Sequence, residues 1–186
     1  MIEVRLGVVG TGNIGMQHIT LIGSGQVKGA KLAATVSRSG EAINTSIPHF
    51  TSVESALESR CCDALLIATP TMDHVGAATA AMQQGVHVLL EKPIAMSVAQ
   101  SEALIAKIPE GMTLGVMLNQ RFHPAYSALK KLLSERAIGE VQRYAWTMTA
   151  WYRPDIYYKV SSWRGTWPGE GGGLLINQCI HNLDII

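Results

Sequence analysis

The sequence lacks an excess of charge of either sign. It has 15 Lys and Arg against 14 Asp and Glu, so its formal net charge at pH 7 is +1. Proteins that bind nucleic acid or a membrane surface usually concentrate positive charge. The near-neutral balance therefore gives no electrostatic indication of either partner. The composition, 47% hydrophobic and 16% charged, is that of an ordinary globular protein.

Cysteine and long apolar runs are also scarce. The three cysteines, of which Cys61 and Cys62 are adjacent, form neither a disulfide framework nor the spacing of a zinc site. No apolar run approaches the ~20 residues that span a bilayer. Glu3 and Arg5 interrupt the apolar start of the chain, which argues against a signal-peptide core. We therefore expect a reduced, cytoplasmic protein.

A glycine-rich turn follows the first predicted strand, residues 4–10. The sequence GTGNIG at 10–15 leads into a helical pattern that runs to about Ile22. A strand before and a helix after form the context in which G-x-G-x-x-G binds a dinucleotide. Gly10 would permit the tight turn, Gly12 the approach of the pyrophosphate and Gly15 close packing of helix on strand. The helix N-terminus, with Asn13 and Ile14, would supply N–H donors.

The end of the second predicted strand, residues 31–36, bears on which dinucleotide binds. An NAD site places Asp or Glu on the ribose 2′-hydroxyl, about 20 residues beyond the glycines. This chain has Ser37 and Arg38 there, and the first carboxylate after them is Glu41. A hydroxyl and a guanidinium suit a 2′-phosphate. We predict NADP as the preferred cofactor, with NAD as the alternative.

Strands and helices continue to alternate up to residue 120. Apolar runs predict strands over 63–69, 86–90 and 112–118, and amphipathic patterns predict helices over 52–59, 71–84 and 97–108. Ser52 is the expected cap of the first of these helices, and Gly85 ends the second. This alternation is typical of an α/β protein with a doubly wound parallel sheet.

Polar residues follow two of these predicted strands. Thr69 and Pro70 close one strand, and His74 lies in the first turn of the next helix as a cofactor contact or a structural cap. Glu91 and Lys92 follow the run VHVLL at 86–90. Ligands of open α/β sheets bind beyond the carboxyl ends of the strands, so Thr69, Pro70, Glu91 and Lys92 are candidate cofactor contacts. Lys92 is therefore a candidate to orient a substrate hydroxyl, although a surface Glu-Lys pair would look the same.

Beyond residue 120 the character of the sequence changes. We predict a helix over 125–135 and a long strand over 139–151, rich in aromatic and β-branched residues, which would begin a second sheet. The loop at 152–173 is the most aromatic part of the chain and fits either the faces of a sugar ring or a subunit interface. Its notable side chains are those of Tyr152, Tyr157, Tyr158, Trp163, Arg164 and Trp167.

The last segment, 171–186, has a helical pattern. Asn177, His181 and Asp184 fall at i, i+4 and i+7, on one face, and most other positions are apolar. A helix this apolar should be buried, so its polar stripe needs partners, such as a substrate or the neighbouring backbone. The stripe lacks a third convincing ligand and an acidic base for zinc, so we favour acid–base chemistry and predict no metal.

Taken together, the motifs resemble the glucose–fructose oxidoreductase / inositol dehydrogenase / rhizopine-catabolism (Gfo/Idh/MocA) family. The resemblance covers essentially the whole chain. It implies a Rossmann domain over 1–120 and, over 121–186, the beginning of a second α/β domain with an open, mainly antiparallel sheet that commonly packs against another subunit. The matching motifs are GTGNIG at 10–15, ATP at 68–70, EKP at 91–93, RFHP at 121–124, SWRGTW at 162–167 and GGGLLINQCIHNLD at 171–184.

The resemblance also implies an activity, namely reversible hydride transfer between nicotinamide and a carbon of a sugar or cyclitol. Lys92 matches the active-site lysine and His181 the acid–base histidine, while Trp163 and Arg164 match a pair near the nicotinamide end of the cofactor. Asn177 departs from the aspartate of many members. Because an amide cannot take a proton, that step would fall on His181. The resemblance thus makes Lys92, Asn177 and His181 candidate substrate contacts, and the aromatic loop adds Tyr152 and Tyr158.

Two other functions remain open within this family. Some members are glycosidases that use bound NAD for transient oxidation of the sugar, and one is a non-catalytic regulator that binds the dinucleotide as a signal. The presence of both Lys92 and His181 argues against a regulator. Because members are usually much longer, we expect the chain to be a fragment and a homo-oligomer to form through the second sheet of a full-length protein.

Overall fold

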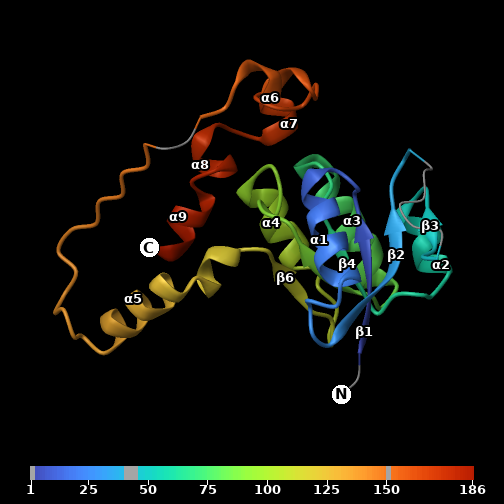
Figure 1. The fold of residues 1–186 in the computed structure, drawn as a ribbon, viewed down its shortest axis with the longest axis horizontal. Helices are drawn as coiled ribbons and strands as arrows, with labels where there is room; N and C mark the ends of the chain where they lie inside the picture. Colours follow the sequence, from blue (N-terminus) through green and yellow to red (C-terminus); the bar gives the residue numbers. More distant parts are fainter. Residues whose placement is uncertain (1–2, 40–45, 150–151) are drawn as a thin grey trace. The chain divides into compact units, whose positions relative to one another are not determined.

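The structure is a computed structural model that describes residues 3–39, 46–149 and 152–186. The chain divides into two compact units, Met1–Met117 and Leu118–Ile186. Figure 1 shows a sheet with helices in the first unit and a series of helices in the second.

The first unit is built on a parallel sheet of six strands in the order β3-β2-β1-β4-β5-β6. This is the strand order of the dinucleotide-binding doubly wound fold. The expected strands are found, several of them shorter than expected, and β3 is an addition. Their bounds are β1 Val4–Val9, β2 Ala30–Val36, β3 His49–Phe50, β4 Ala64–Ile67, β5 His87–Leu90 and β6 Leu114–Val116.

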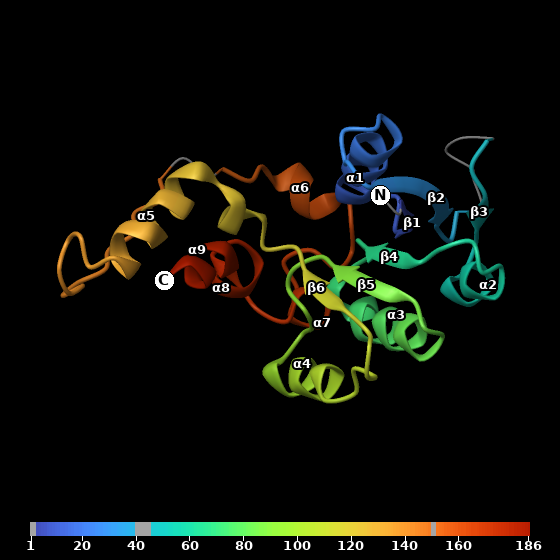
Figure 2. The same ribbon diagram turned by 90° about the horizontal axis from the view of Figure 1, so that it is seen from below.

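Ser52 caps its helix as predicted, and Ser97, where the pattern placed the start of another helix, is a second cap. The Ser52 and Ser97 hydroxyls accept the backbone N–H groups of Ser55 and Gln100. Gly85 follows its helix with a φ of 74°, a value that favours glycine. Figure 2 shows the first helix on one face of the sheet and the other three on the opposite face. Their bounds are α1 Asn13–Gly23, α2 Val53–Glu58, α3 Thr71–Gln83 and α4 Val98–Ile105.

The apolar core consists of one layer on each face of the sheet. Side chains of a strand alternate between faces, and β4 shows this directly: Leu65 and Ile67 join the layer beneath α2, α3 and α4, whereas Leu66 joins the layer beneath α1. All three side chains are at most 2% exposed. A strand covered on both faces reads as a continuous apolar run, which is why these strands were predictable.

The pairing register brings the carboxyl ends of the strands level. Val9 pairs with Val36 on one side and with Ile67 on the other, and Ile67 in turn pairs with Leu90. The residues that follow these strands therefore emerge in one row along a single edge of the sheet. This edge carries the glycine turn, the ATP motif and the EKP motif.

The regular elements of the second unit are short helices, joined by irregular segments. No strand forms over 139–149, so the prediction of a strand at 139–151 is wrong there; residues 150–151 lie outside the described part. A strand forms only when another strand accepts its hydrogen bonds, and residues 118–149 and 152–186 offer none. The helices are η1 Asn119–Phe122, α5 Pro124–Ser134, α6 Asp155–Lys159, α7 Trp167–Glu170, α8 Leu174–Asn177 and α9 Ile180–Ile185.

The terminal segment also differs from the prediction. Instead of one helix it forms α8 and α9, separated at Gln178 and Cys179. Its apolar side chains are not buried, because Leu175 is 66% exposed and Leu183 54%. Apolar periodicity indicates which face should be covered, but coverage requires a neighbouring surface, and the described residues supply none for these side chains.

Candidate functional site

The glycine turn after β1 has the geometry that a pyrophosphate site requires. Gly10 has a φ of +95°, and a Cβ there would lie 2.6 Å from the Ala68 carbonyl oxygen. A Cβ on Gly15 would lie 1.8 Å from the Gly10 carbonyl oxygen. A Cβ on Gly12, by contrast, would meet nothing within 4 Å. Two glycines are thus required by the protein itself, whereas the space at Gly12 suits the close approach of a ligand.

Helix α1 starts at this turn, three residues earlier than expected. Its first residues, Asn13 and Ile14, are exposed, and Ile14 is 46% exposed. The N–H groups of a first helical turn have no intrahelical partners and favour anions. The turn and helix therefore fit the phosphates of a dinucleotide.

The end of β4 adds a polar atom that lacks a protein partner. Thr69 Oγ1 is buried and makes no hydrogen bond to any described residue. Buried hydroxyls are normally hydrogen-bonded. An unsatisfied one beside the glycine turn fits a contact with a bound cofactor, as does the neighbouring Pro70, which precedes α3.

His74, in the first turn of α3, joins two of the strand ends. Its side chain is 1% exposed. Its Nδ1 atom lies 2.9 Å from the carbonyl oxygen of Pro93, and its Nε2 atom lies 3.0 Å from that of Thr69. His74 thereby links the ATP and EKP motifs through their backbone carbonyl groups.

The EKP motif at the end of β5 is anchored to the first helix. Glu91 Oε1 lies 2.8 Å from Nε2 of His18 on α1, and Glu91 Oε2 accepts the N–H of Lys92 at 3.2 Å. Lys92 itself is half-buried, and the Lys92–Pro93 peptide is cis. His18 could not be found from the sequence, because nothing about a histidine in a helix indicates a partner 73 residues away.

The end of β2 carries the residues predicted to choose the cofactor. The N–H of Gly10 donates to the Val36 carbonyl at 2.8 Å, which places this strand end beside the glycine turn. Ser37 Oγ lies 2.9 Å from Ser39 Oγ and 3.3 Å from Nε2 of His49. Arg38 is exposed. Glu41 lies outside the described residues.

In the second unit the aromatic loop folds around two arginines. The guanidinium carbons of Arg153 and Arg164 lie 4.8 and 4.2 Å from the centre of the Tyr157 ring. Arg164 also lies 5.1 Å from the Trp163 ring, and its buried Nε makes no hydrogen bond within the described chain. Tyr152 is 85% exposed.

The Trp163–Arg164 segment ends in a tight turn. Gly165 has a φ of +69°, and a Cβ there would lie 2.9 Å from the Tyr158 ring. The turn thereby packs against Tyr158, which is 42% exposed.

Asn177 lies between a carboxylate and a guanidinium. Its Nδ2 donates to Glu170 Oε1, and its Oδ1 accepts from Nη2 of Arg153 at 3.0 Å. Glu170 is 7% exposed. Neither partner was predicted, although the sequence EGGG at 170–173, next to the predicted site, marks the buried acid.

The terminal stripe is anchored to the RFHP motif. Arg121 Nε and Nη2 donate to Asp184 Oδ2 and Oδ1 at 2.8 and 2.5 Å. These bonds lower the pKa of the Asp184 carboxyl, with a smaller contribution from the charge of His181. His181 and Asp184 are thus electrostatic neighbours, while Asn177 belongs to the Glu170 contact.

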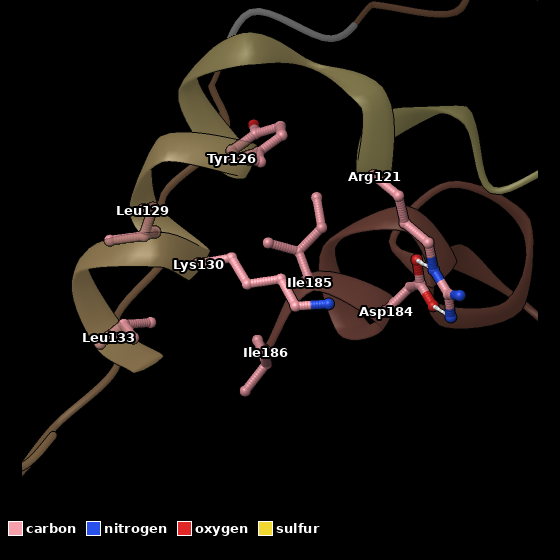
Figure 3. Close-up of a pocket in the computed structure, with 8 residues that line it drawn as sticks. All are labelled: Arg121, Tyr126, Leu129, Lys130, Leu133, Asp184, Ile185 and Ile186. Carbon is pink, nitrogen blue, oxygen red and sulfur yellow. Dashed lines mark hydrogen bonds and ion pairs between the residues drawn. The ribbon is translucent and has the colours of Figure 1, made fainter. Parts of the chain in front are cut away.

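A pocket in the second unit lies between α5 and the end of α9 (Figure 3). None of the predicted site residues lines it. In this view Lys130 of α5 extends towards the two terminal isoleucines, and Arg121 points to Asp184. Its lining residues are Arg121, Tyr126, Leu129, Lys130, Leu133, Asp184, Ile185 and Ile186.

No group of three or more His, Cys, Asp or Glu side chains among the described residues could hold a metal ion. No helix in the described ranges is both long enough and apolar enough to cross a bilayer.

Comparison with known proteins yields two family matches. Residues 4–118 match the family described as "Oxidoreductase family, NAD-binding Rossmann fold", and residues 126–186 match the "GFO/IDH/MocA C-terminal domain". The chain is 33% identical to UDP-N-acetylglucosamine 3-dehydrogenase of Acidithiobacillus ferrooxidans, over 70% of this chain and 42% of that protein. It is 30% identical to scyllo-inositol 2-dehydrogenase (NAD(+)) of Bacillus subtilis, over 98% and 53%.

Solved structures show the same relationship. The structure of the WlbA dehydrogenase from Bordetella pertussis with NADH and UDP-GlcNAcA superposes with a TM-score of 0.84 and 28% identity. That match covers 98% of this chain and 58% of the other. The chain spans about half the length of the curated relatives it matches.

Proposed function

Since the chain belongs to the Gfo/Idh/MocA oxidoreductase family, we propose that it serves hydride transfer between a nicotinamide dinucleotide and a secondary alcohol of a sugar, cyclitol or related polyol. The observation that carries the proposal is the level row of strand ends. The glycine turn, the unsatisfied Thr69 hydroxyl and the half-buried Lys92 follow the neighbouring strands β1, β4 and β5.

Each protein group in this proposal has one task. The nicotinamide ring, when bound, accepts or returns the hydride. Lys92 orients the substrate hydroxyl and stabilises negative charge that develops on its oxygen. His181 accepts the hydroxyl proton, because the amide of Asn177 cannot. Asn177 contributes to the polar surroundings through its hydrogen-bonding amide.

The remaining predicted residues have roles in binding. We propose that Trp163 and Arg164 contact the cofactor, and that the exposed Tyr152 and Tyr158 provide apolar faces for a sugar ring. Arg38, exposed at the end of β2, would bind a 2′-phosphate and thereby favour NADP over NAD. The relatives support a sugar or polyol substrate, since those compared act on inositols and a nucleotide sugar according to their names.

The test of this proposal is Lys92→Ala. Nicotinamide reduction would be followed by absorbance with scyllo-inositol, myo-inositol and UDP-N-acetylglucosamine as substrates. We expect kcat to fall by orders of magnitude, because charge stabilisation at the reacting oxygen is lost, while the Kd of the cofactor changes little. Lys107→Ala, at an exposed lysine of the same unit, is the matched control. Unchanged turnover in Lys92→Ala would refute the assignment.

A further inference from the structure

Glu170 is the most deeply buried acidic residue that the structure describes. It ends α7 and is 7% exposed. Its two oxygens have different partners: Oε2 accepts the Gly165 N–H at 2.9 Å, and Oε1 accepts from Asn177 Nδ2. A carboxylate taken out of water needs such donors. This carboxylate therefore connects the turn after Trp163–Arg164 with the last residue of α8.

The surrounding turn is built to hold Glu170 in place. Thr166 Oγ1 donates to the Trp163 carbonyl at 2.8 Å and accepts the Gly169 N–H at 3.1 Å. A Cβ on Gly169 would lie 2.2 Å from the same carbonyl oxygen, so α7 can approach only with glycine there. The position of the carboxylate is thus set by the backbone around it rather than by a flexible loop.

The contacts of Asn177 fix the direction of its amide. An amide has one donor end and one acceptor end. The donor end faces Glu170, and the acceptor end faces Arg153, whose Nη2 also donates to Gln178 Oε1 at 3.0 Å. Reversing the amide would set donor against donor and acceptor against acceptor. Asn177 therefore bridges a buried carboxylate and a guanidinium in one orientation.

An acid at position 177 would not fit this arrangement. Aspartate would bring a second carboxylate against Glu170 Oε1, and two carboxylates in contact cannot both remain ionised. Changing both residues together, Glu170→Gln with Asn177→Asp, restores the hydrogen bonds. The new glutamine can donate to the aspartate and still accept the Gly165 N–H. Either pair is complementary, and either single change breaks it.

We propose that Glu170 is a positioning residue of the candidate site, and that it forms with Asn177 a coupled pair in which only one member carries the negative charge. Glu170 thereby orients α8, and with it the segment that leads to His181. The contacts carry the pairing by themselves; its relevance to catalysis rests on the proposed function.

A reciprocal exchange tests the pair. The parent would be compared with Glu170→Gln, Asn177→Asp and the double variant, each unfolded by denaturant at pH 7 and followed by tryptophan fluorescence. Trp163 and Trp167 flank the turn, so this signal reports on the site. We expect the transition midpoint to fall in both single variants and to return towards the parent value in the double variant. Glu135→Gln, which changes an exposed carboxylate just after α5, should leave the midpoint unchanged.

The results of this experiment distinguish a failure of the Glu170–Asn177 pairing from a failure of the proposed activity. Additive losses in the double variant would overturn the proposal, because an uncoupled structural role predicts no rescue. A side-chain amide signal of Asn177 that keeps its NMR shift in Glu170→Gln would also overturn it. Rescue in a chain without turnover would support the pairing and count against the activity. Where the parent turns over, kcat should follow the same pattern, lost in each single variant and recovered in the double.

Discussion

The two units of this chain depend on different kinds of interaction. Every buried hydrophobic residue in the described ranges lies in the first unit, between Leu6 and Leu104. In the second unit the buried residues of the described part are Gly169 and Glu170, and large side chains such as Phe122 and Trp167 are 84% and 77% exposed. The first unit is a packed core with a glycine turn at its edge. The second is organised by hydrogen bonds, ring contacts and an ion pair.

The difference shows when the sequence pattern of one segment is enough to predict its structure. In the first unit each predicted strand pairs with neighbouring strands of one sheet, so the strand that its apolar pattern predicts does form. In the second unit the same kind of pattern indicates a face without supplying the surface that covers it. Residues there are held by polar contacts between positions far apart in the sequence.

The largest effect should come from a core truncation. Leu90, fully buried in β5, leaves a cavity when changed to Ala, which should lower the free energy of unfolding by about 2–5 kcal/mol. Leu175→Ala, at a side chain that is 66% exposed in α8, should stay within about 0.5 kcal/mol. Denaturant unfolding followed by far-UV circular dichroism measures both. Equal losses would contradict the contrast between the units.

A smaller loss of stability, with loss of binding, should follow a methyl group at the glycine turn. Gly15→Ala sets a Cβ against the Gly10 carbonyl and should cost about 1–3 kcal/mol through overpacking. It should also weaken NADH binding at least tenfold, because the first turn of α1 must move. Gly76→Ala in α3, where a Cβ meets nothing within 4 Å, should instead gain about 0.5–1 kcal/mol. If Gly15→Ala bound NADH with the parent's affinity, the glycine turn would not be part of the cofactor site.

The smallest effect concerns the Arg121–Asp184 ion pair of the second unit. Arg121 lowers the pKa of Asp184 in the folded state, so this carboxyl stabilises the fold above its unfolded pKa, near 3.9. That contribution is lost as pH falls from about 4 through the lower, folded pKa. All four tryptophans lie between residues 146 and 167, so their fluorescence follows this unit.

The measurement is denaturant unfolding followed by tryptophan fluorescence at a series of acid pH values. We expect the denaturant concentration at the midpoint to fall as the pH falls in the parent, and to fall less in Asp184→Asn. Asp155→Asn, at an exposed carboxylate of α6, should retain the parent's slope. The shift should be modest, because Arg121 is largely exposed and solvent screens the pair. Identical slopes in Asp184→Asn and the parent would show that the ion pair does not stabilise the folded unit.

Much of the first unit could be predicted from sequence because its determinants are local. A glycine with a positive φ, a serine cap and a run of apolar residues each mark a structure within a few positions. The two-residue strand β3 carried too little pattern to be found. The contact of His18 with Glu91 and the contacts of His74 depend on how the strand ends meet, which no single segment encodes.

In the second unit the sequence indicated which segments carry candidate site residues, but it predicted their secondary structure less well. The aromatic loop and the polar stripe were identified, but the strand over 139–149 and the continuous terminal helix were wrong. A strand needs a pairing partner and a buried helix needs a covering surface, and neither requirement can be checked within one segment. The buried acid Glu170 was missed because its burial results from the turn around it.

The most direct test of the central claim is a fluorescence titration of the chain with NADPH and, separately, NADH. The account predicts saturable binding of both, tighter for NADPH, with the preference lost in Arg38→Ala and binding weakened at least tenfold in Gly15→Ala. Equal affinities in the parent would contradict the role given to Ser37 and Arg38. A folded chain that binds neither dinucleotide would contradict the account as a whole.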